Sequence, residues 1–365
     1  MSFEVDIRAV GESTTSGDAI AIRYGTFNGN PSAQRVVVID GGFEDNGEDL
    51  IRLITNVYNT NRVDLMISTH PHDDHLIGLH EIMERLDVRE LWMHRPWEHA
   101  DSVRSYVRDK RITAQRFSER LQRSLESAYE LEQLAIKHGI APVEPFTGTS
   151  FDGRLFVIGP SLSYYNALVC EFGEAVSTVG KFLESFEAVP QKVSALRRRI
   201  NETLAGPEEL VEPAIGDVNA RNNSSAIIVA KLDDKGFLLT ADAGVPALTL
   251  AANYADSRNY NLGLNTTHVQ IPHHGSKRNV GPAILNRIIG ERGQHSGKQS
   301  FVSASKEWNT KHPSMRVTNA FNRRGAKVYG TRGNSLCFHS PDVSVRAGWE
   351  SAKEIPFAHQ YEEEE

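Results

Sequence analysis

Three histidines and two aspartates stand within six residues of one another, in the segment Thr69-His70-Pro71-His72-Asp73-Asp74-His75. Side chains two residues apart point to the same side of an extended chain, so His70 and His72 are expected to share one face. A turn into a helix at Asp74 and His75 would direct those two side chains back toward the same space. Imidazoles and carboxylates this close together are suitable ligands for Zn²⁺ and, less specifically, for Mn²⁺ or Fe²⁺.

Buried elements flank this cluster on both sides. Residues 63–68 form an apolar run that predicts a buried strand leading directly into the histidines. Residues 76–86 carry apolar side chains at helical spacing and predict a helix after them. Burying such polar side chains without partners would cost on the order of several kcal/mol, so a role in packing does not explain the cluster.

The rest of the chain predicts an α+β fold. Apolar runs at residues 36–39, 226–232, 237–240 and 269–271 predict further strands, and the order of strands and helices indicates two packed sheets with helices outside. Residues 101–139 and 171–210 have charged, helical patterns and are interpreted as insertions. They would serve as a lid, as docking faces or simply as solvated helices. One domain over residues 1–350 is expected, followed by an acidic tail at 351–365 that ends in four glutamates.

The histidine cluster resembles a known signature. His70-x-His72-x-Asp74-His75 is similar to the HxHxDH motif of the metallo-β-lactamase superfamily, whose fold is an αββα sandwich. Other segments resemble further motifs of that family, namely Asp40-Gly41-Gly42, the strand end around Asp242, and Pro272-His273-His274-Gly275-Ser276. Ser16-Gly17-Asp18 and Asn222-Asn223-Ser224-Ser225 resemble one branch of it, which includes the hydrolase domain of the competence DNA-uptake channel ComEC.

The resemblance implies a dinuclear site for two divalent ions, with Zn²⁺ expected and Mn²⁺ as the alternative. It implies six ligands: His70 and His72 for one ion, Asp74, His75 and His274 for the other, and Asp242 between the two. Catalysis is expected to depend on Asp74 and His75. Asp40, His273 and Asn223 are expected to support the ligands from behind.

One departure from the family concerns the first ion. Many members carry a further histidine after the strand that corresponds to residues 155–158, but this chain has Gly159-Pro160-Ser161 there. The branch that includes ComEC is similar in lacking it. Water, Asn223 or the substrate would then complete the coordination of this ion.

Two ions of this kind generate a metal-bound hydroxide as nucleophile and stabilise both oxygens of an in-line displacement. The fold does not fix the substrate. Between residues 271 and 333 the chain has 12 basic residues and two acidic ones, within a protein of net charge -7. A basic stretch at the mouth of the site would attract a polyanion, although these side chains would equally face solvent elsewhere. Ser276, Lys277 and His312 are the expected substrate contacts, His312 because it precedes an expected helix start.

The leading hypothesis is therefore a phosphodiesterase or nuclease acting on nucleic acid or a nucleotide. A lactone, thioester or β-lactam hydrolase is the alternative among enzymes, and a non-catalytic scaffold is the alternative outside them. No segment resembles a signal peptide, and no apolar run approaches the roughly 20 residues of a membrane span, so a cytoplasmic protein without membrane contact is expected. Protein partners would dock on the helical insertions, and the oligomeric state is left open.

Overall fold

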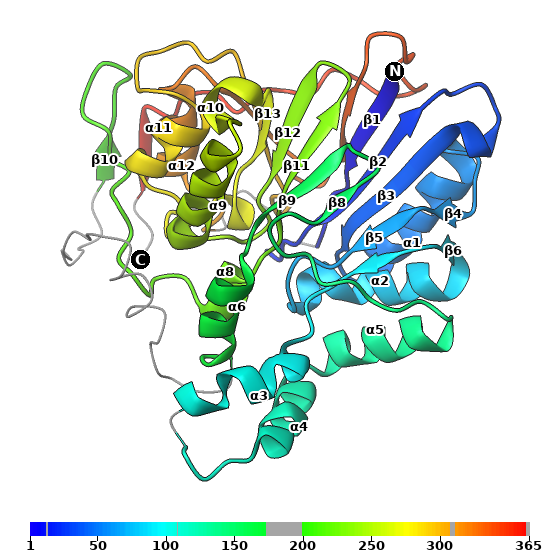
Figure 1. The fold of residues 1–365 in the computed structure, drawn as a ribbon. Helices are drawn as coiled ribbons and strands as arrows, with labels where there is room; N and C mark the ends of the chain where they lie inside the picture. Colours follow the sequence, from blue (N-terminus) through cyan, green and yellow to red (C-terminus); the bar gives the residue numbers. More distant parts are fainter. Residues whose placement is uncertain (12–13, 108, 173–198, 307–310, 363–365) are drawn as a thin grey trace.

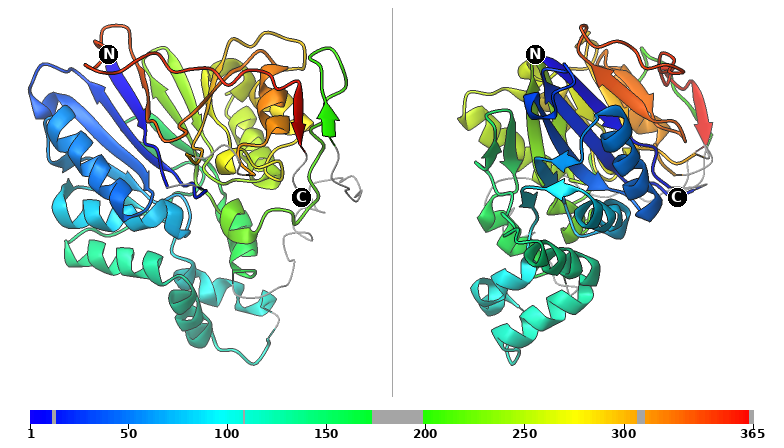
Figure 2. Two further views of the ribbon diagram at one scale, coloured as in Figure 1. Left: turned by 180° about the vertical axis from the view of Figure 1, so that it is seen from behind. Right: turned by 90° about the vertical axis from the view of Figure 1, so that its right-hand side faces the viewer.

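Two β-sheets lie face to face in the computed structural model, and helices cover the outer side of each (Figure 1). The views from behind and from the side show the same layers (Figure 2). The structure describes residues 1–11, 14–107, 109–172, 199–306 and 311–362. The arrangement confirms the α+β fold and the αββα sandwich expected from the order of elements.

Within the described residues, the first sheet has six strands in the order β16-β1-β2-β3-β5-β7. Their bounds are Ser2–Ile7 for β1, Ala19–Gly25 for β2, Gln34–Gly41 for β3, Leu65–Ile67 for β5, Leu91–Trp92 for β7 and Leu336–His339 for β16. Helices α1 (Glu44–Arg52) and α2 (Asp73–Arg85) cover its outer face, and α5 (Glu126–Lys137) packs on α2. Strands β4 (Arg62–Val63) and β6 (Asp87–Val88) form a small separate pair.

The second sheet has seven strands in the described part of the chain, in the order β15-β14-β13-β12-β11-β9-β8. Their bounds are Ser150–Phe151 for β8, Leu155–Gly159 for β9, Ile227–Leu232 for β11, Lys235–Leu239 for β12, His268–Gln270 for β13, Gln299–Val302 for β14 and Lys327–Gly330 for β15. The helices on its outer side are α9 (Val245–Ser257), α10 (Leu262–Asn265), α11 (Pro282–Ile288) and α12 (Met315–Asn322).

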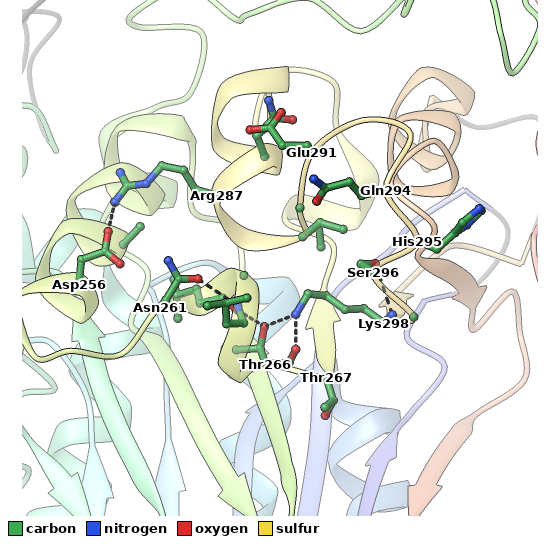
Figure 3. Close-up of a pocket in the computed structure, with 18 residues that line it drawn as sticks. Asp256, Asn261, Thr266, Thr267, Arg287, Glu291, Gln294, His295, Ser296 and Lys298 are labelled. Carbon is green, nitrogen blue, oxygen red and sulfur yellow. Dashed lines mark hydrogen bonds and ion pairs between the residues drawn. The ribbon is translucent and has the colours of Figure 1, made fainter.

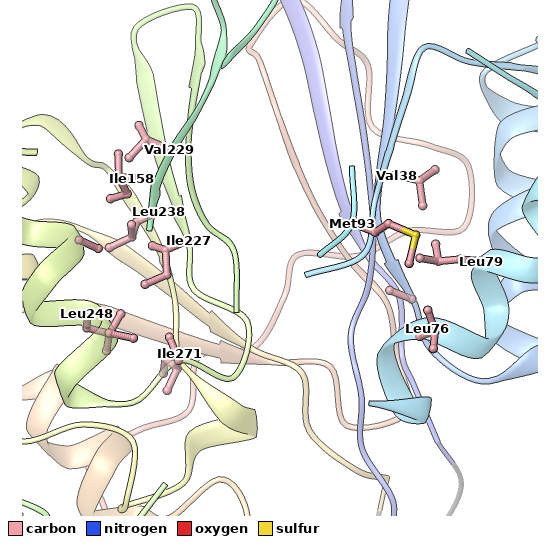
Figure 4. Close-up of a cluster of buried hydrophobic side chains, with 14 of the residues drawn as sticks. Val38, Leu76, Leu79, Met93, Ile158, Ile227, Val229, Leu238, Leu248 and Ile271 are labelled. Carbon is pink, nitrogen blue, oxygen red and sulfur yellow. The ribbon is translucent and has the colours of Figure 1, made fainter. Parts of the chain in front are cut away.

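The alternation of apolar side chains explains the layers. In β3, Val37 and Ile39 belong to the cluster between the two sheets, whereas Val38 belongs to the cluster under the helices, where Leu79 also lies. Figure 4 shows Val38 beside Leu79 on α2, well apart from the corresponding layer of the second sheet. Each fully buried side chain of this size stabilises the fold by about 1.5–3 kcal/mol. Strands that are apolar on both faces therefore require cover on both.

The interval 101–139, expected to be helical, contains helices α3 (Ala100–Val103), α4 (Ala114–Ser124) and α5. Helices α6 (Leu162–Val169) and α8 (Ala220–Asn223) follow later in the chain. Residues 173–198 of the second expected insertion lie outside the described residues. Its described remainder is not helical: β10 (Arg199–Asn201) pairs with β17 (Gln360–Glu362), so the helical prediction is wrong for that part.

The C-terminal segment packs against the sandwich as far as the structure describes it. The backbone N–H of Ile355 donates to the Val328 carbonyl at 2.7 Å, and Tyr361 in β17 is buried. Described residues beyond 350 therefore contact the sandwich, and the domain boundary expected at residue 350 stays a prediction. Among the described helices, none has the length and apolar character that crossing a bilayer requires.

Candidate metal centre

Strand β5 delivers the histidine cluster to one edge of the sandwich. His70 lies just after the strand, and His72 is the extended residue immediately before α2. Their ring nitrogens meet as expected, with His70 Nε2 at 3.2 Å from His72 Nδ1. The hydroxyl of Thr69 lies 3.0 Å from His70 Nδ1 and fixes the orientation of that ring. The first two expected ligands are thus held on one side of the site.

Asp40, at the end of β3, orients His75. Strands β3 and β5 run parallel, so Asp40 lies beside Thr69 and accepts from its backbone N–H at 2.8 Å and from its hydroxyl at 2.7 Å. The same carboxylate lies 2.8 Å from His75 Nδ1. A carboxylate on one imidazole nitrogen leaves the other nitrogen free to bind a metal. Asp40 therefore orients His75 from behind, and its role in supporting a metal ligand stays a prediction.

Asp242 reaches the centre from the second sheet, after β12. Its Oδ2 lies 3.6 Å from His70 Nε2, and its Oδ1 lies 3.5 Å from His75 Nε2. One carboxylate oxygen therefore faces each of the two expected ligand sets. This arrangement is the one that a bridging ligand requires.

His274 enters from the turn after β13, in the short helix η5 (His273–Gly275). Its Nε2 lies 3.8 Å from Asp74 Oδ2 and 3.8 Å from Asp242 Oδ1. His274 has φ 54° and His273 has φ 47°, a left-handed conformation that non-glycine residues seldom adopt. Gly275 follows with φ 83°, and a Cβ there would lie 2.5 Å from Pro313. Such strain is found mostly at functional sites.

The unsatisfied atoms of the centre fit a metal ion. His75 Nε2, His274 Nε2 and Asp242 Oδ1 are buried without a hydrogen-bond partner. The two histidine nitrogens lie 3.5 Å and 3.8 Å from Asp242 Oδ1, and each lies 3.8 Å from Asp74 Oδ2. A tetrahedral ion with bonds of about 2.0–2.1 Å would hold its ligands roughly 3.3 Å apart. A small contraction around a divalent ion would therefore satisfy all of them, and the mixed nitrogen and oxygen donors suit Zn²⁺ or Mn²⁺.

The charges of the centre depend on one another. Burial opposes the charge of His75, but Asp242, Asp40 and Asp74 around it raise its pKa well above the ordinary value. Burial also opposes the charge of Asp242, yet the neighbouring histidines lower the pKa of that carboxyl well below its usual range. By contrast, burial lowers the pKa of His70 to about 3, so this ring is neutral. The carboxylates thus stabilise positive charge on the neighbouring histidines. A metal ion that replaced these protons would be stabilised by the same carboxylates.

Asp18 is a member of the centre that the expected ligand set omits. It comes before β2, its Oδ2 accepts from Gln270 Nε2 at 2.7 Å, and its Oδ1 is buried without a partner. Together with Asp242 and His274 it forms a further group whose ligand atoms lie within 4.8 Å of one another. A Cβ on Gly17 would lie 2.0 Å from the Asp74 carbonyl, so only glycine allows this approach. The Ser16-Gly17-Asp18 motif was the signal that could have identified it.

His273 and the asparagines of α8 form the open flank of the centre. His273 Nε2 lies 3.6 Å from Asp242 Oδ2, and its Nδ1 lies 3.0 Å from Asn222 Nδ2 and 3.1 Å from Asn279 Oδ1. Asn223 instead donates to the Val218 carbonyl and accepts from a backbone N–H. Asn222, rather than the expected Asn223, therefore contacts the histidines. The sequence pattern marked both asparagines and gave no means of choosing between them.

The three expected substrate contacts differ in their surroundings. Ser276 is buried, and its hydroxyl accepts from the Arg278 backbone at 3.3 Å, which stabilises the turn. Lys277 is partly buried beside it. His312 lies near the centre, with its ring 6.0 Å from that of His273. It does not directly precede a helix as expected, because α12 begins at Met315 and Ser314 is the residue before it.

The basic stretch does not act as one surface at the site. Several of its side chains have partners elsewhere in the chain: Arg287 pairs with Asp256 at 2.7 Å, Arg323 with Glu202 at 2.8 Å, and Arg324 with Glu208 at 2.7 Å. Lys298 is buried and donates to the Thr266 carbonyl. These four residues therefore do not contribute to a basic mouth, the first of the two alternatives, because their acidic and carbonyl partners come from outside the stretch.

A cavity of about 680 Å³ lies at the opposite end of β13, where Thr266 and Thr267 precede the strand (Figure 3). Arg287, Lys298 and Glu291 are among the residues that line it. The charged side chains there include the Arg287–Asp256 ion pair and the Lys298 hydrogen bonds described above. No group of metal ligands occurs in that cavity among the described residues. The histidine centre is the better candidate for chemistry.

Residues 32–163 match the family model described as the metallo-beta-lactamase superfamily. This range contains Asp40 and the whole HxHxDH segment. Residues 32–163 carry a metallo-β-lactamase superfamily domain. Clusters that could bind metal begin in this range and extend beyond it to Asp242 and His274.

Solved structures similar to this metallo-β-lactamase domain include three with low identity. A Thermotoga maritima protein described as a metallo-beta-lactamase has 12% identity and a TM-score of 0.28, covering 51% of this chain and 92% of its own. Unliganded yeast PDE1 has 10% identity and a TM-score of 0.42, covering 90% and 97%. A diphosphatase of the PhnP family has 9% identity and a TM-score of 0.36, covering 92% and 97%. Sequence identities and TM-scores this low support no conclusion about the activity of this chain. No curated protein matches the sequence.

Proposed function

We propose that this chain is a metal-dependent phosphodiesterase, acting on nucleic acid or a nucleotide at a dinuclear site. The observation that carries the proposal is the double ligand set around one carboxylate. His70, His72 and Asp242 form one group, and Asp74, His75 and His274 form another beside it, with Asp242 facing both. Two adjacent cation sites that share a ligand suit in-line displacement at phosphorus.

Two divalent ions, when bound, would supply Lewis acidity and a hydroxide nucleophile at neutral pH. The residues of the chain supply their positions. Asp40 holds the His75 ring through Nδ1, and Thr69 holds His70 in the same way. Gln270 accepts from the Thr240 and Ala241 backbone with its Oε1, which fixes the loop that carries Asp242. We propose Lys277 and His312 as contacts to the substrate at the rim, with Ser276 shaping the turn between them and the ligands.

The resemblance to the branch that includes ComEC favours nucleic acid over smaller esters. The Ser16-Gly17-Asp18 and Asn222-Asn223 motifs, on which that resemblance depends, both contribute side chains to the centre. DNA uptake itself is not proposed for this chain. The proposal is instead a cytoplasmic enzyme whose substrate is a nucleic acid or a nucleotide.

A set of matched hydrolysis assays tests the proposal. Wild-type protein with Mn²⁺ or Zn²⁺ is incubated with single-stranded DNA, duplex DNA, RNA, bis-p-nitrophenyl phosphate and a lactone. His72→Ala removes one ligand, and His295→Ala is the matched control, because His295 lines the distant cavity and is exposed. Metal-dependent cleavage of phosphodiesters that is lost only in His72→Ala is expected. Cleavage of the lactone alone, by protein shown to hold metal, would replace the proposal with a carbon-centred hydrolase.

A further inference from the structure

Arg221 is a charged side chain beside the centre that has no part in the function proposed above. It belongs to α8, between Asn219, which caps that short helix, and Asn222, which contacts His273. The backbone just after α8 is held to the centre as well, because the Ala226 N–H donates to the Thr69 carbonyl at 3.0 Å. The guanidinium donates to the Ser124 carbonyl, and Ser127, three residues later, donates to Asp73, the neighbour of His72, so Arg221 lies at the rim of the centre.

The guanidinium of Arg221 is fixed but lacks a counter-ion. Its Nη2 donates to the Phe172 carbonyl at 3.2 Å and to the Ser124 carbonyl at 3.5 Å. Burial lowers the pKa of this half-buried group, and Asp73 offsets only part of that effect. Within the described residues no carboxylate forms an ion pair with it, and neither Nε nor Nη1 forms a hydrogen bond, since both of its hydrogen bonds start from Nη2. A held guanidinium with donors that no protein group uses is a suitable partner for an anion.

Arg221 lies at the rim beside the segment that carries His72. His72 belongs with His70 and Asp242 to the first ligand group. We propose that Arg221 binds a non-bridging oxygen of the phosphodiester placed at this position, and so selects anionic phosphodiesters over neutral esters. A rigid guanidinium suits this task because its donors match two phosphate oxygens at once. The inference rests on the proposed function and names the residue that would set its substrate class.

The test compares Arg221→Met, Arg221→Lys and the matched control Arg287→Met, which removes the same charge at the distant cavity. Binding of orthophosphate to the metal-loaded proteins is measured by titration calorimetry, and metal content is measured alongside. Hydrolysis of bis-p-nitrophenyl phosphate and of the neutral ester p-nitrophenyl acetate is then measured for each protein. Arg221→Met should weaken orthophosphate binding at least tenfold with metal content unchanged, Arg221→Lys should lie between, and Arg287→Met should match the wild type.

The loss of kcat/KM in Arg221→Met should be at least tenfold larger for the phosphodiester than for the neutral ester, and added methylguanidinium should restore part of it. Equal losses on both substrates, or unchanged orthophosphate binding, would show that Arg221 only ties α8 to its neighbours. If Arg221→Met does not fold, orthophosphate binding by Arg221→Lys equal to that of the wild type overturns the proposal. If the wild type binds orthophosphate through Arg221 but cleaves no phosphodiester, the proposed function fails and the anion site stands.

Discussion

Both ends of β13 carry polar side chains, but the protein satisfies their hydrogen-bonding groups differently at the two ends. At the end that leads to His274, buried nitrogens and oxygens of His75, His274 and Asp242 have no partner and lie close together. At the other end, which lines the cavity of about 680 Å³, Lys298 is hydrogen-bonded and Arg287 is paired with Asp256. Unsatisfied buried groups cost free energy, so they persist where a ligand completes them. The candidate site is therefore distinguished by buried polar atoms that lack hydrogen-bond partners, and not by the size of a cavity.

Asp242→Asn should produce the largest contrast between the two ends. Loss of a residue that only supports a metal ligand costs about 10–100-fold, so loss of a ligand shared by two ions should cost on the order of 10³-fold or more in kcat/KM. Asp256→Asn is the matched change at the other end and should leave hydrolysis unaltered. Comparable losses in both variants, measured on the same substrate, would remove the distinction.

Asp40→Asn should have an intermediate effect. Asp40 contacts His75 Nδ1 and the Thr69 main chain, so the amide would change the proton position and the orientation of the ring. An expected loss of about 10–100-fold in metal affinity follows from this supporting role. Competition with a metal indicator would measure it. Wild-type affinity in this variant would show that Asp40 is not needed to orient His75.

Chelation should affect stability through the histidine end alone. An ion present at about 100 times its dissociation constant adds about 2.7 kcal/mol, which corresponds to roughly 3–4 °C in Tm for a chain of 365 residues. EDTA should therefore lower Tm by that amount, and Zn²⁺ or Mn²⁺ should restore it. The His295→Ala control should show the same shift, whereas Asp242→Asn should show almost none. A Tm that does not respond to chelation of metal-loaded protein would contradict the account.

Lys298 allows a smaller test at the other end, by pH. Burial lowers its pKa to about 8, whereas a lysine in the unfolded chain titrates near 10.4. Between these values the unfolded state binds more protons than the folded state, so the contribution of Lys298 makes stability rise with pH. Lys298→Met should lack that rise and should hydrolyse substrate normally. Urea unfolding at pH 7 to 10.5 measures the difference between the two proteins, and a difference that is constant over this range would contradict the prediction.

The local part of the centre could be predicted from the sequence because its residues are adjacent. His70, His72 and His75 stand at spacings that a strand and a helix start convert directly into geometry. Apolar alternation likewise predicted the packed sheets, since strands such as β3 are buried on both faces. These predictions need only the periodicity of the backbone.

Contacts between distant segments could not be predicted in this way. Gln270 and Asp18 are 252 residues apart, and the partner of Arg323 is 121 residues away in Glu202. The alternatives for the basic stretch stayed open for that reason, because counting charges within a segment ignores carboxylates that the fold brings from elsewhere. Arg221 carried no signal at all, since an isolated arginine in a polar segment is indistinguishable from a solvated one until its surroundings are known.

Metal content per chain tests the central claim most directly. Elemental analysis of wild-type protein, His72→Ala and His274→Ala, each loaded with Zn²⁺ or Mn²⁺ and desalted, reports how many ions each protein holds. The account predicts two ions in the wild type and one in each variant, because each variant removes a ligand from a different group. Wild-type protein without bound metal, or variants that retain the wild-type content, would contradict a dinuclear centre shared through Asp242.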